Sequence, residues 1–464
     1  MIKKLSFFLS LYIFSASGFS QETTLIINDI QISGNLTTKE NIITRELTFQ
    51  RGDTILITNF EHQVERSREN ILNTFLFNYV TITTSENFNS LINIFINVEE
   101  RWYTWPSLLL LYDDRNFSSW LKSSDISKTK YGISVQRFNC FGRKETLKFS
   151  VLLGYTRQFS ISYKNIALDK NRKHFIGADI EFSKQDEIII DTKENKPITF
   201  KNSLSSVFER KKYTLNYLFR PQIDDLHNFY LNFFEYYAAD TVIALNPDFI
   251  GKNANRLDCI TLDYVFSSDR RDIKAYPLKG SYFEILIGQT LSIPLSKNSI
   301  SSTVIIPSYY KYFKISNNFY YATGFNLKLS YTNTNSFIYS KSLGYNYNMH
   351  GFEYNTIEGQ HLLIYKNLIK IAILKPKVTE ISFIPLKKFN KIHYALYFNI
   401  FTDCGYVSNK YLNQTNSYAN KFLFSSGAGL DLVTYYDRTL RAEYSINGFG
   451  YSGFYFHLTA PINK

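Results

Sequence analysis

Polar and apolar side chains alternate along Thr146-Leu147-Lys148-Phe149-Ser150-Val151, and a similar pattern returns in Phe159-Ser160-Ile161-Ser162-Tyr163 and in Tyr282-Phe283-Glu284-Ile285-Leu286-Ile287. Because successive side chains of a β-strand point to opposite faces, a period of two predicts strands with one apolar face. From about residue 131 onward helical periodicity disappears and such segments follow one another. The sixteen strands that we expect lie near 131–140, 145–155, 158–166, 173–183, 199–209, 212–221, 228–238, 257–268, 280–291, 304–315, 319–332, 359–374, 393–407, 422–434, 439–446 and 453–460.

The composition favours β-structure at a membrane. Of the 464 residues 17% are aromatic, with 40 Phe and 36 Tyr. Aromatic residues favour strands, and tyrosine is frequent where a barrel surface meets the membrane interface. After the first twenty residues no apolar run approaches the roughly 18 residues of a membrane-spanning helix. A barrel strand needs only about ten alternating residues, so we expect an all-β transmembrane barrel of sixteen antiparallel strands over residues 131–464.

The alternative is a set of soluble β-sandwich domains. Three observations argue against it: there is no linker between sandwiches, the segments are long for soluble sheets, and the inserts are unequal in length, as at 184–198, 239–256 and 333–356. Short turns on one rim and long loops on the other are typical of outer-membrane barrels. A bilayer also requires closure, because an open edge in lipid leaves backbone groups unpaired.

The first twenty residues indicate export. Lys3 and Lys4 precede an apolar run over 5–14, and small residues follow up to Ser20. This pattern predicts a signal peptide over residues 1–20, cleaved before Gln21. The cysteines are too few and too far apart for a disulfide framework or a CxxC-type metal site.

Residues 21–100 mix helical and strand patterns. A strand over 25–33 is followed by two helices, each opened by a capping box, and then by strands over 79–84 and 91–98. The order β-α-α-β-β predicts a small α+β module. Residues 101–130 contain all three tryptophans; we interpret them as a periplasmic collar, and the alternative is an additional edge strand.

The charge and the motifs exclude several functions. The formal net charge is +12, but Lys and Arg are spread along the chain, so we expect no nucleic-acid partner. A basic surface facing anionic lipid, such as lipopolysaccharide, explains this charge better. No GxSxG, HExxH or P-loop motif occurs, and the seven histidines show no metal-ligand spacing. We therefore expect no enzyme, no catalytic residue, no metal and no cofactor.

The order of these elements resembles the BamA-like outer-membrane assembly factors, in which periplasmic POTRA modules precede a barrel. Within the module, Ile32-Ser33-Gly34-Asn35, Arg45-Glu46-Leu47 and Gly52-Asp53 resemble a POTRA opening. In the barrel, the resemblance rests on Tyr276-Pro277-Leu278-Lys279-Gly280 and on Gly427-Ala428-Gly429-Leu430. A single POTRA module, where the principal assembly factors usually have several, suggests an accessory or specialised paralogue.

The resemblance also implies a loop inside the barrel. Met349-His350-Gly351-Phe352 stands where the family has an Arg-Gly-aromatic motif at the tip of a loop folded into the lumen, and Asp403 and Gly405 stand where the family receives that tip. His350 replaces an arginine, which would supply a permanent charge. Because histidine is only partly charged near neutral pH, we expect a bond to Asp403 that is conditional on protonation and a loop held less firmly than in relatives. The alternative is an extracellular loop with an incidental histidine.

Recognition in such a protein needs unpaired sheet edges rather than catalytic groups, because a client strand has unpaired backbone donors and acceptors. One edge is expected on the second strand of the POTRA module. The other is expected at a lateral seam between the first barrel strand (131–140) and the last (453–460). The POTRA edge comprises Tyr79, Val80, Thr81, Ile82 and Thr83, and the seam comprises Tyr131, Cys140, Gly450, Gly453, Phe454 and Phe456.

We expect the protein to insert β-barrel proteins into the outer membrane of a Gram-negative-type bacterium, or to translocate protein across it. Its partners would then be unfolded outer-membrane or secreted clients, lipid and accessory assembly subunits. A dedicated two-partner-type exporter, a passive porin or receptor, and a lipid-modifying enzyme are the alternatives. A loop folded inward over 333–356 would argue against an open pore.

Overall fold

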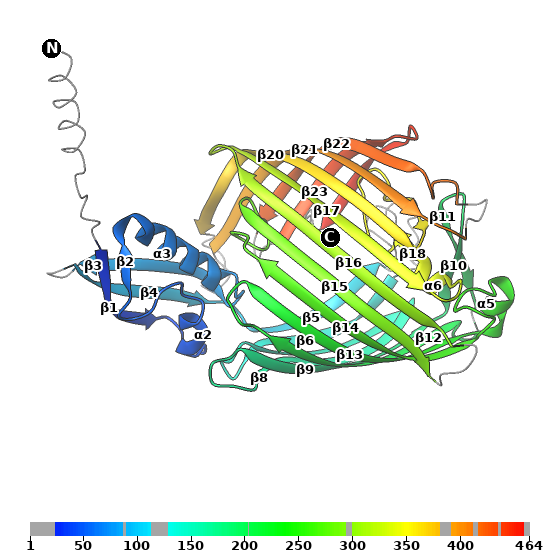
Figure 1. Ribbon diagram of the computed structural model, residues 1–464, viewed down its shortest axis with the longest axis horizontal. Helices are drawn as coiled ribbons and strands as arrows, with labels where there is room; N and C mark the ends of the chain where they lie inside the picture. Colours follow the sequence, from blue (N-terminus) through cyan, green and yellow to red (C-terminus); the bar gives the residue numbers. More distant parts are fainter. Residues whose placement is uncertain are drawn as a thin grey trace, which may run out of the picture. The chain divides into compact units, whose positions relative to one another are not determined.

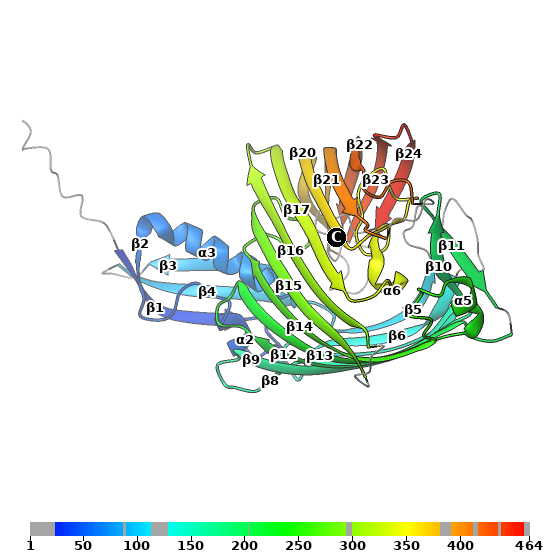
Figure 2. The ribbon, with the colours of Figure 1, turned by 45° about the vertical axis from the view of Figure 1, so that its right-hand side comes forward.

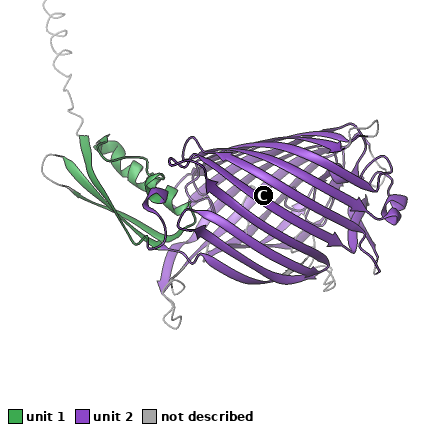
Figure 3. Cartoon of the chain, turned by 90° about the horizontal axis from the view of Figure 1, so that it is seen from below, with its two compact units in different colours: residues 1–35, 43–99 green, residues 36–42, 100–464 purple. Residues whose placement is uncertain are grey.

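The computed structural model describes residues 24–86, 90–112, 129–202, 204–293, 299–380, 391–411, 416–434 and 438–458. The predicted signal peptide (1–20) and part of the predicted collar, including Trp120, lie outside the described residues. The chain divides into two compact units, which Figure 3 colours separately. The smaller comprises 1–35 and 43–99, and the larger comprises 36–42 and 100–464.

The smaller unit has the order β-α-β-α-β-β, which is the predicted order with one additional short strand, over 54–56, between the two helices. Among its described residues, four strands form one sheet in the order β2-β1-β4-β3, in which β1 and β4 are parallel. Alternate residues of β4 are buried, as expected of a strand with one face on a core. Helix α3 contacts β2 and β3. The elements are β1 (Thr24–Ser33), α2 (Glu40–Thr44), β2 (Thr54–Leu56), α3 (Ile57–Leu72), β3 (Phe77–Glu86) and β4 (Leu91–Glu100).

The larger unit is built on one curved antiparallel sheet (Figures 1 and 2). Within the described residues this sheet has sixteen strands, so the predicted fold class is confirmed. Its strands, in order along the sheet, are β5 (Thr104–Tyr112), β6 (Thr129–Cys140), β7 (Glu145–Gly154), β8 (Thr156–Ala167), β9 (His174–Gln185), β12 (Phe208–Phe219), β13 (Asp225–Ala238), β14 (Arg256–Asp269), β15 (Gly280–Ile293), β16 (Ser301–Lys314), β17 (Phe319–Thr332), β20 (His361–Glu380), β21 (Lys391–Ser408), β22 (Phe422–Thr434), β23 (Arg438–Asn447) and β24 (Ser452–Leu458).

Two of the predicted strand assignments are wrong. The first strand of the sheet is β5, so part of the predicted collar (101–130) is an edge strand of the barrel. The leucine run from Leu108 to Leu111 has no alternation, which hides β5 from a search for a period of two. The expected strand over 199–209 is also absent from the sheet, because β11 (Lys196–Lys201) pairs with β10 (Glu187–Lys193) in a separate hairpin.

The polarity of the two faces is inverted relative to a soluble protein. On β23, every second residue is exposed and its neighbours are buried. The exposed positions include Leu440, Tyr444 and Ile446, whereas Arg441 and Glu443 are buried. An apolar outer face with a polar inner face is the pattern of a barrel that stands in lipid.

Smaller elements connect the strands. They are α5 (Asp240–Leu245), α6 (Phe337–Ser340), β18 (Lys341–Leu343) and β19 (Ile357–Glu358). Side chains of the β10–β11 hairpin, α5 and α6 pack together in one apolar cluster that includes Ile188, Val242 and Phe337. Within the described part of the chain, no helix is long and apolar enough to cross a membrane.

Candidate functional site

The segment 333–356, between β17 and β20, lies against the polar inner face of the sheet. Met349 and Phe352 are each 1% exposed and pack in an apolar cluster with residues of three strands, Ile364 of β20, Val407 of β21 and Leu423 of β22. These partners alternate with exposed neighbours along their strands, so they point into the lumen. We call the segment 333–356 the lumen loop; Figure 2 shows its helix α6 on the concave side of the sheet.

The tip of the lumen loop is bound to β21 through an imidazole–carboxylate pair. His350 Nδ1 lies 2.8 Å from Asp403 Oδ2, and the backbone N–H of His350 donates to the same oxygen at 3.2 Å. The His350 ring stacks on Phe401 with 4.0 Å between centroids. Asp403 is buried.

A strand residue supplies the permanent positive charge that the loop tip lacks. Arg441 Nη1 on β23 lies 3.3 Å from His350 Nε2. A neutral imidazole with its proton on Nδ1 donates to Asp403 and accepts from Arg441, so both ring nitrogens are satisfied. The contact between His350 and Asp403 therefore does not need a protonated imidazole. Arg441 also binds Asp431 through two bonds, of 2.6 and 2.8 Å.

Two glycines allow the loop tip to approach the strands closely. Gly351 has φ +77° and its carbonyl accepts a hydrogen bond from Asn447 Nδ2 at 2.8 Å; a Cβ on this glycine would lie 3.2 Å from Ser425 Cβ. A Cβ on Gly405 would lie 3.2 Å from Met349 Sδ. The structure thus brings together all the residues that the resemblance assigned to the loop tip and its acceptor.

A second loop reaches the same network from the other side of the lumen. Tyr276, between β14 and β15, donates to Asp431 Oδ2 at 2.7 Å. Lys370 Nζ of β20 lies 3.7 Å from the centre of the Tyr276 ring. Sequence reasoning noted the motif around Tyr276 but missed Asp431, Arg441 and Glu443 as partners. Polar residues at every second position of β22 and β23 are the signal that could have pointed to them.

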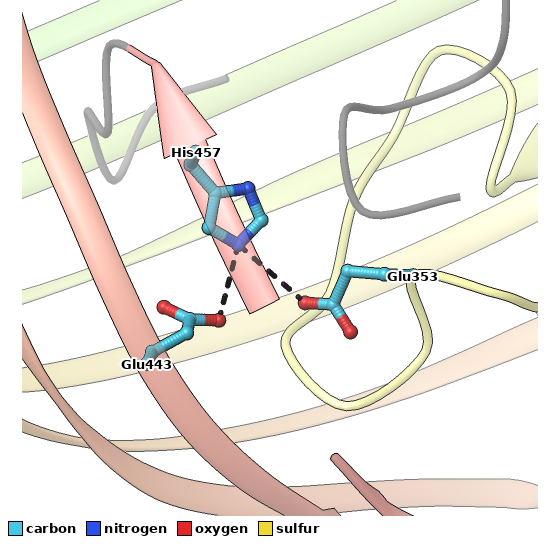
Figure 4. A group of neighbouring side chains, drawn as sticks. All are labelled: Glu353, Glu443 and His457. Carbon is cyan, nitrogen blue, oxygen red and sulfur yellow. Dashed lines mark hydrogen bonds and ion pairs between the residues drawn. The ribbon is translucent and has the colours of Figure 1, made fainter. Parts of the chain in front are cut away.

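The lumen loop also meets the last strand of the sheet. His457 Nε2 of β24 lies 3.2 Å from Glu443 Oε1 of β23 and 3.9 Å from Glu353 Oε1 of the lumen loop (Figure 4). Glu353 and Glu443 are buried. Glu353 is 90 residues or more from the other two in the sequence, so no motif spacing could reveal the group.

The β10–β11 hairpin extends to the lumen loop. Thr356 N–H donates to the carbonyl of Asn195 at 2.8 Å, and the Thr192 hydroxyl lies 3.0 Å from the Tyr345 hydroxyl. Asn195 Oδ1 also accepts from the backbone N–H of Tyr418 at 2.9 Å. The hairpin tip, at Glu194 and Asn195, turns with two successive positive φ angles, as a two-residue hairpin turn requires.

The predicted seam needs one correction. Tyr131 and Cys140 lie on β6, the second strand, which pairs with β5 on one side and β7 on the other. The first strand is β5, because the sheet begins before the segment where alternation becomes visible. Gly453, Phe454 and Phe456 do lie on β24, the last strand, and Gly450 lies in the turn before it with φ +83°. Within the described residues, β5 and β24 are the two ends of the sheet.

The predicted client edge of the smaller unit lies on β3. This strand contains Tyr79, Val80, Thr81, Ile82 and Thr83. It is an outer strand of its sheet, next to β4.

Comparison with known proteins supports this description. Residues 139–458 match the family model described as the Omp85 superfamily domain, and residues 25–101 match the POTRA model, described as a surface antigen variable number repeat. A comparison with curated proteins gave no match.

Two solved structures show the same fold. The crystal structure of BamA from Haemophilus ducreyi lacking POTRA domains 1–3 is 15% identical, with a TM-score of 0.51, and the match covers 94% of this chain and 84% of that one. CdiB from Escherichia coli is 10% identical, with a TM-score of 0.52, and the match covers 94% of this chain and 76% of that one.

Proposed function

Because the chain belongs to the Omp85 superfamily, we propose that it assembles β-barrel proteins in the outer membrane by pairing a client strand with an edge of its own sheets. Members of this superfamily are outer-membrane proteins with a general role in protein insertion or translocation. In our proposal the barrel spans the outer membrane of a Gram-negative-type bacterium and the smaller unit lies in the periplasm. The clients are unfolded outer-membrane proteins, and accessory subunits and lipid are further partners.

The terminal strand β24 carries the proposal. Within the described residues it pairs with β23 on one side and is one end of the sheet. In lipid, each unpaired backbone group costs several kcal/mol. An arriving client strand would satisfy the backbone groups that are left unpaired when this end strand opens.

Residue-specific photo-crosslinking tests this role. A crosslinker at Phe454 of β24, whose side chain is 70% exposed, should capture unfolded barrel clients. The matched control is Leu231 of β13, which is 45% exposed in the middle of the sheet and should capture none. A second probe at Thr81 tests the POTRA edge. If the probes at Phe454 and Thr81 capture no clients beyond those captured from Leu231, strand addition is the wrong mechanism.

The next candidate is a dedicated exporter. Depletion separates the two functions, because loss of an assembly factor lowers the amounts of many outer-membrane barrels, whereas loss of an exporter lowers the secretion of one partner. A passive porin is disfavoured by the lumen loop, which packs on the inner face of the sheet and is contacted at Thr356 by the β10–β11 hairpin. Conductance in planar bilayers tests this point.

A further inference from the structure

One group of side chains has no part in the proposed strand addition. Glu353 comes from the lumen loop, Glu443 from β23 and His457 from β24, and their ligand atoms all lie within 4.8 Å of one another. Figure 4 shows the imidazole of His457 between the two carboxylates. Three elements thus place one nitrogen and two oxygens around a common point.

The distances suit a small coordination sphere. Zn²⁺ binds imidazole nitrogen and carboxylate oxygen at about 2.0–2.2 Å, so two ligand atoms of a tetrahedral site stand about 3.3 Å apart. His457 Nε2 lies 3.2 Å from Glu443 Oε1 and 3.9 Å from Glu353 Oε1. His457 and Glu443 already lie at this spacing, and the loop carboxylate of Glu353 must move closer to both.

Charge and burial also suit a bound cation. Glu443 is 2% exposed, and within the described residues its Oε2 accepts no hydrogen bond. The nearest cationic atoms to this oxygen are at 3.6 Å, on His350, and at 3.9 Å, on Arg441. Two buried carboxylates whose oxygens lie within 4.8 Å of each other repel, and a metal ion bound between them would offset that repulsion.

We propose that Glu353, Glu443 and His457 form a binding site for one divalent transition metal ion of the Zn²⁺ type. An imidazole with two carboxylates suits Zn²⁺ better than Ca²⁺ or Mg²⁺, which prefer six or more ligands and only oxygen. Three protein ligands leave a fourth position for water. The bound ion joins the lumen loop to β23 and to the last strand, β24.

The site would stabilise the end of the sheet from the lumen side. Because β24 is the terminal strand, a bond through His457 adds to its pairing with β23. If β24 receives clients, as proposed above, the metal-bound protein is the form in which this edge is closed. That consequence depends on the proposed function, whereas metal binding itself does not.

The test is a Zn²⁺ titration of the untagged protein in detergent micelles, after chelator treatment, against a chromophoric competitor. We expect one Zn²⁺ per chain, with affinity at least 100-fold lower in His457→Gln and in Glu353→Gln. Matched controls are His227→Gln on β13 and Glu358→Gln on β19, which should bind as the unchanged protein does. Heat-modifiable migration on gels verifies that each variant is folded.

Glu353→Gln lies outside the barrel strands, so it remains informative if His457→Gln does not fold. Hydrogen exchange of β24 should slow when Zn²⁺ is added to the unchanged protein. Absence of stoichiometric binding, binding that survives in folded Glu353→Gln and His457→Gln, or equal losses in the controls would overturn the proposal. The titration uses no client, so its failure would leave the proposed assembly function untouched.

Discussion

The imidazole of His350 on the lumen loop and the carboxylate of Asp403 on β21 lie 2.8 Å apart, where the loop tip meets that strand. Asp403 is buried and receives two bonds from His350, one from the ring and one from the backbone. Removing the His350 ring takes one hydrogen-bond donor away from the buried Asp403 carboxylate. A loss of this kind typically lowers stability by about 1–3 kcal/mol.

We therefore predict that His350→Ala speeds hydrogen exchange of the lumen loop by roughly ten- to a hundredfold, the range that corresponds to such a cost. His227→Ala, which changes a histidine of β13 that contacts Tyr264 of β14, should leave the loop unaffected. Exchange measured by mass spectrometry on peptides covering 345–356 gives the answer. Equal exchange in His350→Ala and the unchanged protein would mean that the apolar contacts of Met349 and Phe352 hold the tip alone.

A second prediction separates backbone strain from close approach. Gly351 and Gly450 have similar positive φ angles, +77° and +83°. A Cβ on Gly351 meets Ser425, whereas a Cβ on Gly450 meets no atom within 4 Å. Both alanine variants carry about 1–2 kcal/mol of left-handed strain, but only Gly351→Ala adds a steric conflict. Limited proteolysis should cleave the lumen loop faster in Gly351→Ala than in Gly450→Ala; equal rates would contradict the close packing of the tip.

The sequence was sufficient for the period of two and for the fold class, because alternation along a strand is a local pattern. The predicted count of sixteen strands agrees with the sheet only because the segment 199–209 was counted while β5 was missed. The sequence was insufficient where the decisive contact is distant. The Leu108–Leu111 run on β5 has no alternation, and its place in the sheet depends on its pairing with β6. Arg441 and Glu443 look like ordinary polar positions of a barrel strand until the lumen loop is folded against them. Likewise, His457 and Glu353 are about a hundred residues apart and become neighbours only when the sheet curves.

The local stability of β18 and β19 should depend on pH, because two partly buried charged groups on these strands have shifted pKa values. Burial raises the pKa of Glu358 to about 7 and lowers the pKa of Lys341 to about 8. Between the ordinary glutamate value and about pH 7, the folded state holds the proton longer than the unfolded state, so local stability falls as the pH rises. Between about pH 8 and the ordinary lysine value, the folded state has already lost a proton that the unfolded state keeps, so stability rises with pH.

Local stability of this pair of strands should therefore be lowest between about pH 7 and 8. Hydrogen exchange of residues 341–343 and 357–358, corrected for the intrinsic rate, measures it. Glu358→Gln should remove the acidic limb of the profile and leave the alkaline limb. A flat profile, or one that falls above pH 8, would contradict these pKa directions.

The Tyr276 hydroxyl gives a prediction for the second loop. It donates to the buried Asp431 carboxylate, which also binds Arg441. Tyr276→Phe keeps the ring against Lys370 and Tyr397 but removes this bond, at a cost of about 1–3 kcal/mol. We expect a lower unfolding midpoint in urea for Tyr276→Phe than for the control Tyr264→Phe, whose hydroxyl lies 2.8 Å from His227 Nδ1 on the neighbouring strand. Similar midpoints would show that Arg441 alone offsets the cost of burying the Asp431 carboxylate.

The last prediction concerns the closure of the lumen by the β10–β11 hairpin. The strands on either side of it, β9 and β12, already pair up to Gln185 and Phe208, so a two-residue turn can replace residues 187–206 without changing the sheet. The hairpin contacts the lumen loop at Thr356 and the segment after β21 at Tyr418. Deleting the hairpin removes these two contacts and leaves the bond between His350 and Asp403 in place. We expect single-channel conductance in planar bilayers to rise severalfold, with normal heat-modifiable folding. If conductance rises only when the deletion is combined with His350→Ala, the loop tip closes the lumen by itself and the hairpin is not a barrier.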